Sequence, residues 1–482
     1  MKPFRFHAVP PQVILIVGVL WCGTIDVLRA ADDVALPVEV IEPNPALLSA
    51  EGSVIFADTL EAIDRLAGNH PTRVGVVADG VSQLLLRVRA SNAVTFSVSP
   101  RFGELRDLSD GANAASTATV QPRASSDGTW WIFALYTAPN DVPGSGVRRM
   151  FTISARGGTR SGSTVLRLES PPVLLVHGLW SNSSTLSGLN DFLRRNGFRI
   201  CADVGCTVNY GTVQPAPSFD PVAAQLDNQF AVNQLITATT NVLNAVRQDG
   251  IAAAQVDVVA HSLGGLIARS RAALRDAERA YLRPENFQRG DFHKLISVGT
   301  PHRGTPVADF LISNRCVRSS FFQGRTLEEY FASIGRPFGR AIEELRTVSP
   351  AITNVGATTG IRSHAIVGIA PGKSPTEGLL SSLPRALGYS LTLDDLLGGN
   401  RNHDTIVPRS SQAGGLPRSA VTLARGTVHA DVDVRDTGET ESRFIRRRIA
   451  QLLRAPAASK IFGNFTALET NAVAIVSQPC LE

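Results

Sequence analysis

The stretch Val256-Asp257-Val258-Val259-Ala260-His261-Ser262-Leu263-Gly264-Gly265 decides the fold. Its first part, Val256–Val259, is mostly apolar and β-branched, which predicts a short strand buried on both faces. Residues 263–280 are rich in Leu, Ala and Arg and predict a helix. Ser262 therefore stands where a strand turns sharply into a helix. Such a turn strains the backbone and raises the hydroxyl above the sheet edge.

The neighbours of Ser262 fit this interpretation. Close packing at the turn leaves room only for very small residues two positions before and after the serine, where Ala260 and Gly264 stand. The helix N-terminus beneath the serine offers free N–H groups and a positive dipole end to a developing oxyanion. A small-x-Ser-x-Gly pattern alone also occurs by chance. The rest of the chain must therefore supply the partners of a nucleophile.

Composition excludes some classes of function. The chain has 482 residues, long enough for two or three domains, and 43% of them are hydrophobic, as in an ordinary globular protein. Its formal net charge is only +5, with basic and acidic residues interspersed. Because no basic tract is interleaved with aromatic residues, nucleic-acid binding has no support.

The N-terminus predicts export. Residues 1–31 combine basic residues, an apolar run over 13–23 and small residues at 30 and 31, as in a signal peptide. Arg29 disturbs the cleavage pattern, so retention as an uncleaved anchor stays open. No later segment is a credible membrane span. Export would place Cys201, Cys206, Cys316 and Cys480 in an oxidising compartment. The alternatives are a local disulfide between 201 and 206, which leaves 316 to pair with 480, or free buried thiols.

The segment before the serine region divides into two parts. Residues 32–69 form an N-terminal segment of uncertain order. Residues 70–170 contain short β-type runs separated by turn residues, which predicts a small all-β sandwich that looks immunoglobulin-like, with Trp130 and Trp131 in its core. The predicted strands are 73–77, 83–88, 94–98, 129–136, 150–155 and 164–168. The expected role of this part is that of a spacer or docking module.

Residues 171–455 change to alternating strands and helices, which predicts a mostly parallel sheet covered on both faces. Residues 456–482 form a C-terminal extension without a clear period. The predicted strands are 173–176, 198–203, 256–259, 294–298, 363–369 and 421–423. The predicted helices are 186–196, 222–248, 266–280 and 439–453.

Acyl transfer by serine needs a base, a carboxylate and oxyanion donors. His177-Gly178-Leu179 follows the first buried strand, so the N–H groups of Leu179 and Leu263 are the predicted oxyanion donors. Asp404, before an apolar pair and a proline, is the predicted carboxylate; Asp394 and Asp395 compete but lie in a Leu-rich, helix-like stretch. His429 follows the final strand and is the predicted base. His261 adjoins the serine but should point away by strand alternation.

Taken together, these motifs resemble the α/β-hydrolase superfamily, in particular bacterial lipases and esterases. The resemblance covers residues 171–453 and includes Thr300-Pro301-His302-Arg303-Gly304, a segment for which we derive no catalytic role. It implies Ser262 as nucleophile, His429 as general base and then acid, and Asp404 as its orienting partner. Ala260 stands where many relatives carry Gly.

The expected function is that of a secreted carboxylic ester hydrolase acting through an acyl-enzyme, with lipid esters as the favoured substrates. Insertions at 309–357 and 373–399 are rich in Leu and Phe and could form a lid and an acyl pocket in transient contact with a lipid interface, or simply pack the core. No cofactor or metal is expected: Asp431 and Asp433 are weak calcium candidates without partners. The alternatives are an acyltransferase with the same triad and a non-catalytic surface binding protein.

Overall fold

We describe the protein from a computed structural model. The described residues are 35–42, 56–109, 113–144, 146–200, 207–210, 217–222, 231–275, 279–358, 360–370, 378–398, 402–430 and 437–467. The predictions for residues 1–31, for Cys201, Cys206 and Cys480, and for Asp431 and Asp433 lie outside them. Cys316 is disulfide-bonded, which excludes a free thiol at this position. No helix of the described residues is long and apolar enough to cross a membrane.

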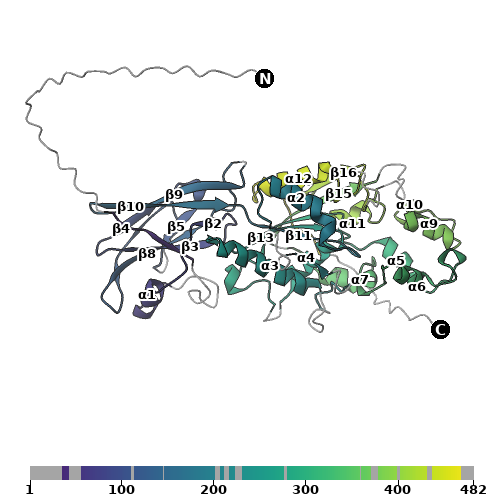
Figure 1. The fold of residues 1–482 in the computed structure, drawn as a ribbon, viewed down its shortest axis with the longest axis horizontal. Coiled ribbons are helices and arrows are strands. Elements are labelled where there is room, and N and C mark those ends of the chain that lie inside the picture. Colours follow the sequence, from purple (N-terminus) through teal and green to yellow (C-terminus); the bar gives the residue numbers. More distant parts are fainter. Residues whose placement is uncertain are drawn as a thin grey trace, which may run out of the picture.

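The N-terminal part consists of two sheets packed face to face (Figure 1). In β9 (Arg148–Gly157), Phe151, Ile153 and Ala155 are buried while the residues between them are exposed, because successive side chains of a strand point to opposite faces. One sheet has the order β1-β3-β8-β5, with β7 on β8, and the other the order β12-β2-β10-β9-β4-β6. The strands not yet bounded are β1 (Glu39–Ile41), β2 (Gly75–Val77), β3 (Gln83–Arg89), β4 (Val94–Ser97), β5 (Glu104–Asp107), β6 (Thr117–Val120), β7 (Arg123–Ala124), β8 (Trp130–Thr137), β10 (Arg160–Glu169) and β12 (Ile251–Ala252).

This part differs from the predicted all-β unit of residues 70–170 in three ways. Strand β1 precedes residue 70 and pairs with β3, so the sandwich starts earlier in the chain. Helix α1 (Leu60–Ala67) packs Ile63 and Leu66 onto the outer face of the first sheet. Strand β12 comes from the second half of the chain and pairs in parallel with β2.

The prediction for the two tryptophans was half right. Trp131 is buried on the face that α1 covers, whereas Trp130 is 48% exposed. Because adjacent residues of a strand alternate between faces, only one of the pair can enter the same core.

The second half of the chain forms a five-stranded parallel sheet of order β11-β13-β14-β15-β16. In β13 (Val256–His261), Val258 and Ala260 face the core beneath α3 and α4, while Val259 faces the core beneath α2 and α12. Helices therefore cover both faces (Figure 1), which explains the mostly apolar strands. The remaining elements of this layer are β11 (Val173–Val176), α2 (Ser187–Arg195), α3 (Ala231–Gln248), α4 (Leu263–Ala273), β14 (Phe292–Val298), β15 (Arg362–Ile369), β16 (Val421–Arg425) and α12 (Arg443–Arg454).

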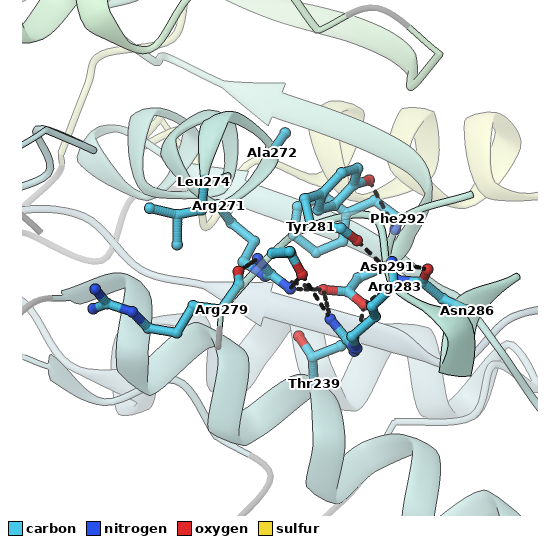
Figure 2. Close-up of polar contacts among 12 residues, drawn as sticks. Thr239, Arg271, Ala272, Leu274, Arg279, Tyr281, Arg283, Asn286, Asp291 and Phe292 are labelled. Atoms are coloured by element: carbon cyan, nitrogen blue, oxygen red, sulfur yellow. Dashed lines mark hydrogen bonds and ion pairs between the residues drawn. The ribbon is translucent and has the colours of Figure 1, made fainter. Parts of the chain in front are cut away.

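A buried ion network holds the connection between α4 and β14 (Figure 2). The guanidinium of Arg271, 1% exposed, lies 2.6 Å from Asp291, and Arg283 lies 2.7 Å from the same carboxylate. Asn286 donates a further hydrogen bond to Asp291 at 3.0 Å. Because both oxygens of Asp291 have charged or amide donors, the buried carboxylate is compensated. The network lies before β14 begins, at the opposite end of that strand from the turn that carries Ser262.

The two predicted insertions are helical and adjoin each other (Figure 1). Phe310 of the first packs edge-on against Tyr389 of the second, and Tyr389 donates a hydrogen bond to Asn314 at 2.9 Å. Their helices are α5 (Pro306–Ser313), α6 (Leu327–Ser333), α7 (Arg340–Glu344), α8 (Pro350–Asn354), α9 (Gly378–Ala386) and α10 (Leu393–Leu396).

Three predicted elements of this half differ clearly from the structure. The helix predicted over 266–280 ends at Ala273, because Leu274 has extended backbone angles of φ −64° and ψ 134°. No strand is formed by Phe198–Ile200, the described part of the predicted strand 198–203. The final helix begins at Arg443 rather than 439, because Ser442 caps it by accepting a hydrogen bond from the N–H of Ile445. Glu439 consequently lies in the turn before the helix.

Candidate active site

Ser262 occupies the turn between β13 and α4. Its backbone angles are φ 53° and ψ −128°, in the region that non-glycine residues rarely adopt. Its N–H donates to the carbonyl of Val298 at 2.9 Å, which fixes the turn on the neighbouring strand β14. A Cβ at Gly264 would lie 2.6 Å from the carbonyl oxygen of His177, so the predicted requirement for a very small residue there follows from the packing.

The structure brings the three predicted side chains together. Nε2 of His429 lies 2.8 Å from Oγ of Ser262, and Nδ1 of His429 lies 2.8 Å from Oδ2 of Asp404. Asp404 is fully buried, and its Oδ1 accepts the backbone N–H groups of Ile406 at 2.9 Å and Val407 at 2.7 Å. The N–H of His429 donates to the Asp404 carbonyl at 2.7 Å, which ties the two loops together. A hydroxyl, an imidazole and a carboxylate in this chain of hydrogen bonds can move a proton from oxygen to nitrogen.

The competing carboxylate has another partner. Oδ1 of Asp394 lies 2.7 Å from Nε2 of His403, whose Nδ1 accepts the N–H of Thr405 at 3.0 Å. Because Nδ1 is an acceptor, Nε2 carries the proton and donates to Asp394. Asp394 thus fastens α10 to the loop that carries Asp404.

His261 does not point away from the site, contrary to the prediction from strand alternation. Its ring packs against that of His429 with 5.0 Å between centroids, and its Nε2 donates to the His429 carbonyl at 3.2 Å. Burial lowers the pKa of His261 to about 3, so this imidazole is neutral. His261 still belongs to β13: it pairs with Val298 and lines a small cavity together with Val259, as alternation requires. The prediction failed because His429 and Glu439 lie against this face of the strand end.

The predicted oxyanion donors lie beside the serine. Val176 at the end of β11 pairs with Ala260 of β13, which places the following Gly178 next to Ser262. A Cβ at Gly178 would lie 2.8 Å from Cβ and 3.3 Å from Oγ of Ser262. Leu179 lines the cavity in front of Ser262, and Leu263 is the first residue of α4, where an N–H has no acceptor within the helix. Both assignments remain predictions.

A cavity of about 320 Å³ opens in front of Ser262 and His429. Its apolar wall comes from α5, α7 and the loop after Asp404, and Trp180 donates to the carbonyl of Pro337 at 2.9 Å, which holds the first insertion against the rim. The first predicted insertion, 309–357, contributes to this wall. Among the described residues of the second, none lines it. The apolar lining residues are Leu179, Trp180, Pro301, Val307, Ala308, Leu311, Ile342, Leu345, Ile406, Val407 and Ala430.

One buried acid at the site was not among the predicted residues. Glu439 is fully buried, with its Oε2 3.6 Å from Nδ1 of His429 and 3.3 Å from Nε2 of His261. Burial, together with the negative charge of Asp404, raises the pKa of Glu439 well above its ordinary value. An acid just before a helix is common, so the sequence carried no signal for this position.

His261, His429 and Glu439 also bring possible metal-ligand atoms within 4.8 Å of one another. Both ring nitrogens of His429 are already hydrogen-bonded, Nδ1 to Asp404 and Nε2 to Ser262, so a cation there would have to displace one of these bonds. The geometry therefore suits proton transfer, and we do not assign a metal to it.

The segment Thr300–Gly304 has a structural role, because its buried side chains contact other parts of the chain. His302 is buried against Phe465 with 3.9 Å between ring centroids, and its Nε2 lies 3.0 Å from Oγ of Ser297. Arg269 of α4 contacts His302 Nδ1 at 3.3 Å and also faces the Phe465 ring. This segment therefore fastens the described end of the chain, around residue 465, to the catalytic layer.

A parallel sheet covered by helices on both faces, with a serine at a strand–helix turn and an imidazole and a carboxylate on later loops, is the arrangement of the α/β-hydrolase fold. Residues 171–314 match the family model described as "Putative serine esterase (DUF676)". The family match and the site together support ester hydrolysis. No curated protein matches the chain.

Several solved structures are similar to part of the chain. A lipase of Bacillus licheniformis, BlEst2 in its mature form, shares 16% identity over 59% of this chain and 91% of its own, with a TM-score of 0.37. Phospholipase PlaB from Legionella pneumophila shares 12% identity over 60% of each chain, with a TM-score of 0.38. The esterase of Pyrobaculum calidifontis shares 15% identity over 64% of this chain and 82% of its own, with a TM-score of 0.30.

Proposed function

We propose that this protein is an exported serine hydrolase that cleaves carboxylic ester bonds, with lipid esters as substrates, through an acyl-enzyme. The observation that carries the proposal is the hydrogen-bonded sequence from Ser262 through His429 to Asp404 beside a mainly apolar cavity. An apolar cleft with a few convergent polar groups is the usual form of a site for such ligands.

The reaction has two halves, acylation of the serine and hydrolysis of the acyl-enzyme. Nε2 of His429 takes the proton of the Ser262 hydroxyl as Oγ bonds to the ester carbonyl carbon, and the imidazolium is held by Asp404. The carbonyl oxygen becomes an oxyanion opposite the N–H groups of Leu179 and Leu263. The C–O bond of the ester then breaks, and His429 returns its proton to the leaving alcohol. Water repeats the cycle on the acyl-enzyme and releases the acid and the free serine.

Two further parts of the proposal rest on separate observations. The disulfide at Cys316 supports export, because such bonds persist in oxidising compartments. The apolar cavity wall supports lipid acyl chains over small polar acids. We propose that the N-terminal sandwich is an immunoglobulin-like module that acts as a spacer.

A fluorophosphonate probe tests the nucleophile. We expect the purified protein to be labelled, and the Ser262→Ala variant to be unlabelled and inactive on p-nitrophenyl esters. Labelling that survives in Ser262→Ala would refute the assignment. A series of p-nitrophenyl esters of increasing chain length then reads the acyl preference, and added alcohols show whether water or another acceptor takes the acyl group.

A further inference from the structure

Glu439 lies behind the proposed triad in a space that two glycines create. A Cβ at Gly299, just after β14, would lie 1.8 Å from Oε2 of Glu439, and one at Gly368 of β15 would lie 2.2 Å from Oε1. Both glycines stand at the carboxyl end of the sheet, next to the loops of Asp404 and His429. The backbone there is shaped to admit a carboxyl group.

The carboxyl of Glu439 is poorly supplied with hydrogen-bond donors. Within the described part of the chain, neither of its oxygens accepts a hydrogen bond of normal distance and angle, and the backbone N–H of Gly368, which faces it, donates to Gln412 at 2.8 Å. The nearest imidazole, His261, is neutral and donates to the His429 carbonyl instead. A buried carboxylate without donors is strongly unfavourable, whereas a carboxylic acid needs only an acceptor for its O–H. Asp404 is in contact with Glu439 and can be that acceptor.

The charged and titratable surroundings agree with a neutral acid. Asp404 and His429 face Glu439 from the catalytic loops and His261 from β13. On its own segment, Glu441 adds a repulsive negative charge. The cation of α12 that lines the same small cavity, Arg446, uses its Nε on the carbonyl of Thr440 at 3.0 Å.

We infer that Glu439 is a positioning residue of the proposed hydrolase: its neutral carboxyl donates a hydrogen bond to Asp404 and holds that carboxylate on Nδ1 of His429. The two carboxyl groups then carry a single negative charge, as close carboxyl pairs do. With the backbone donors at Oδ1 and His429 at Oδ2, this bond completes the fixation of Asp404. The inference rests on the proposed function.

Two variants separate donation from packing. Glu439→Gln keeps the shape and a donor, and we expect its kcat to stay within about threefold of the wild type. Glu439→Leu fills a similar volume without a donor, and we expect its kcat to fall about ten- to a hundredfold with KM little changed. A Leu variant with wild-type kcat, or a Gln variant as slow as Leu, would overturn the inference.

The pH dependence of kcat/KM shows whether Glu439 is charged. If Glu439 is neutral, Glu439→Gln leaves the acid limb of kcat/KM in place. If Glu439 were ionised, removing its negative charge would move that limb down by about one pH unit, because a nearby negative charge favours the protonated form of an imidazole, and this outcome would refute the inference. This readout stands even if the Leu variant fails to fold.

A measurement independent of activity keeps the two proposals apart. Infrared difference spectra between the wild type and Glu439→Gln should show the C=O stretch of a carboxylic acid that only the wild type has, whereas the contribution of buried Glu344, whose pKa is about 7, is common to both proteins and cancels. Wild-type protein that is inactive yet shows this band would refute the hydrolase and leave the proton assignment standing. An active enzyme without the band would refute the inference alone.

Discussion

At the scale of single residues, Gly178 shows how closely the backbone must approach the proposed nucleophile. Gly178→Ala would place a methyl group 2.8 Å from Cβ of Ser262, so either the serine or the loop before Leu179 must move. We expect kcat/KM on a p-nitrophenyl ester to fall about a hundredfold, because a displacement of about 1 Å has that cost. Gly146→Ala is the matched control, since its nearest contact would be an ordinary 3.5 Å. Unchanged activity of Gly178→Ala would contradict the described approach.

Ser262 itself stores backbone strain, with φ at 53°. Glycine adopts such angles freely, and removing strain of about 1–3 kcal/mol outweighs the extra freedom of an unfolded glycine, about 0.4–1 kcal/mol. Ser262→Gly should therefore raise the free energy of unfolding by about 1 kcal/mol in urea titrations, while abolishing activity. Ser262→Ala loses the same hydroxyl but keeps the Cβ. If alanine stabilises the protein as much as glycine, strain is not the cause.

At the scale of elements, α7 carries a pH-sensitive anchor. Glu344 is buried and accepts the N–H groups of Phe219 at 2.7 Å and Asp220 at 3.2 Å. Burial raises its pKa from 4.5 to about 7, so the folded state holds the proton more tightly than the unfolded chain. The resulting contribution to stability is complete below pH 4.5 and is lost as the pH rises through about 7.

The variant Glu344→Gln tests the direction of this pH dependence of stability. Urea titrations between pH 4.5 and 8 should show that the stability of the wild type relative to Glu344→Gln declines across this range; the comparison cancels the opposite pH dependence of buried histidines such as His261, whose pKa is lowered. Glu343→Gln, on the same helix with a side chain 44% exposed, should keep the wild-type slope. If the stability of the wild type relative to Glu344→Gln rises over this interval, the direction of the pKa shift is contradicted.

The sequence predicted those elements whose signal is local. Val173–Val176 is a strand with the predicted bounds, because an apolar run after Pro171-Pro172 needs no distant information. The strand Glu39–Ile41 was missed, since three residues carry little pattern and their partners lie at 85–87. Ser262, Asp404 and His429 could be found because each follows a recognisable strand. Glu439 could not be found in this way, because the fold brings it beside Asp404 and no local sequence pattern marks it.

At the scale of the whole molecule, the sandwich and the parallel sheet are joined at several points. Strand β12, four residues before β13, belongs to a sandwich sheet, and Lys294 of β14 lies 3.2 Å from Asp141 of the sandwich part. Arg199 lies 3.0 Å from Glu169 at the end of β10. The chain therefore passes directly from the N-terminal sandwich into β13, the strand that precedes Ser262.

The carboxylate of Asp79 links the sandwich to the residues just before β13. It is 2% exposed, and its Oδ2 accepts the N–H groups of Ala254 at 3.3 Å and Gln255 at 3.2 Å, just before β13, as well as the hydroxyl of Ser82 at 2.7 Å. Asp79→Ala leaves these buried donors unpaired, and we expect a loss of about 3 kcal/mol in the free energy of unfolding. Calorimetry should show one transition in the wild type and a lower or divided transition in the variant.

The control for Asp79 is an acid that organises only its own turn. Asp127 accepts hydrogen bonds from Ser125 and Thr129 within one exposed sandwich turn, so Asp127→Ala should keep the single transition and the wild-type kcat on a p-nitrophenyl ester. Because Asp79 fixes the residues that lead into β13, Asp79→Ala should lower kcat as well as stability. If it lowers stability while kcat and the single transition stay as in the wild type, the sandwich stabilises the catalytic part without positioning Ser262.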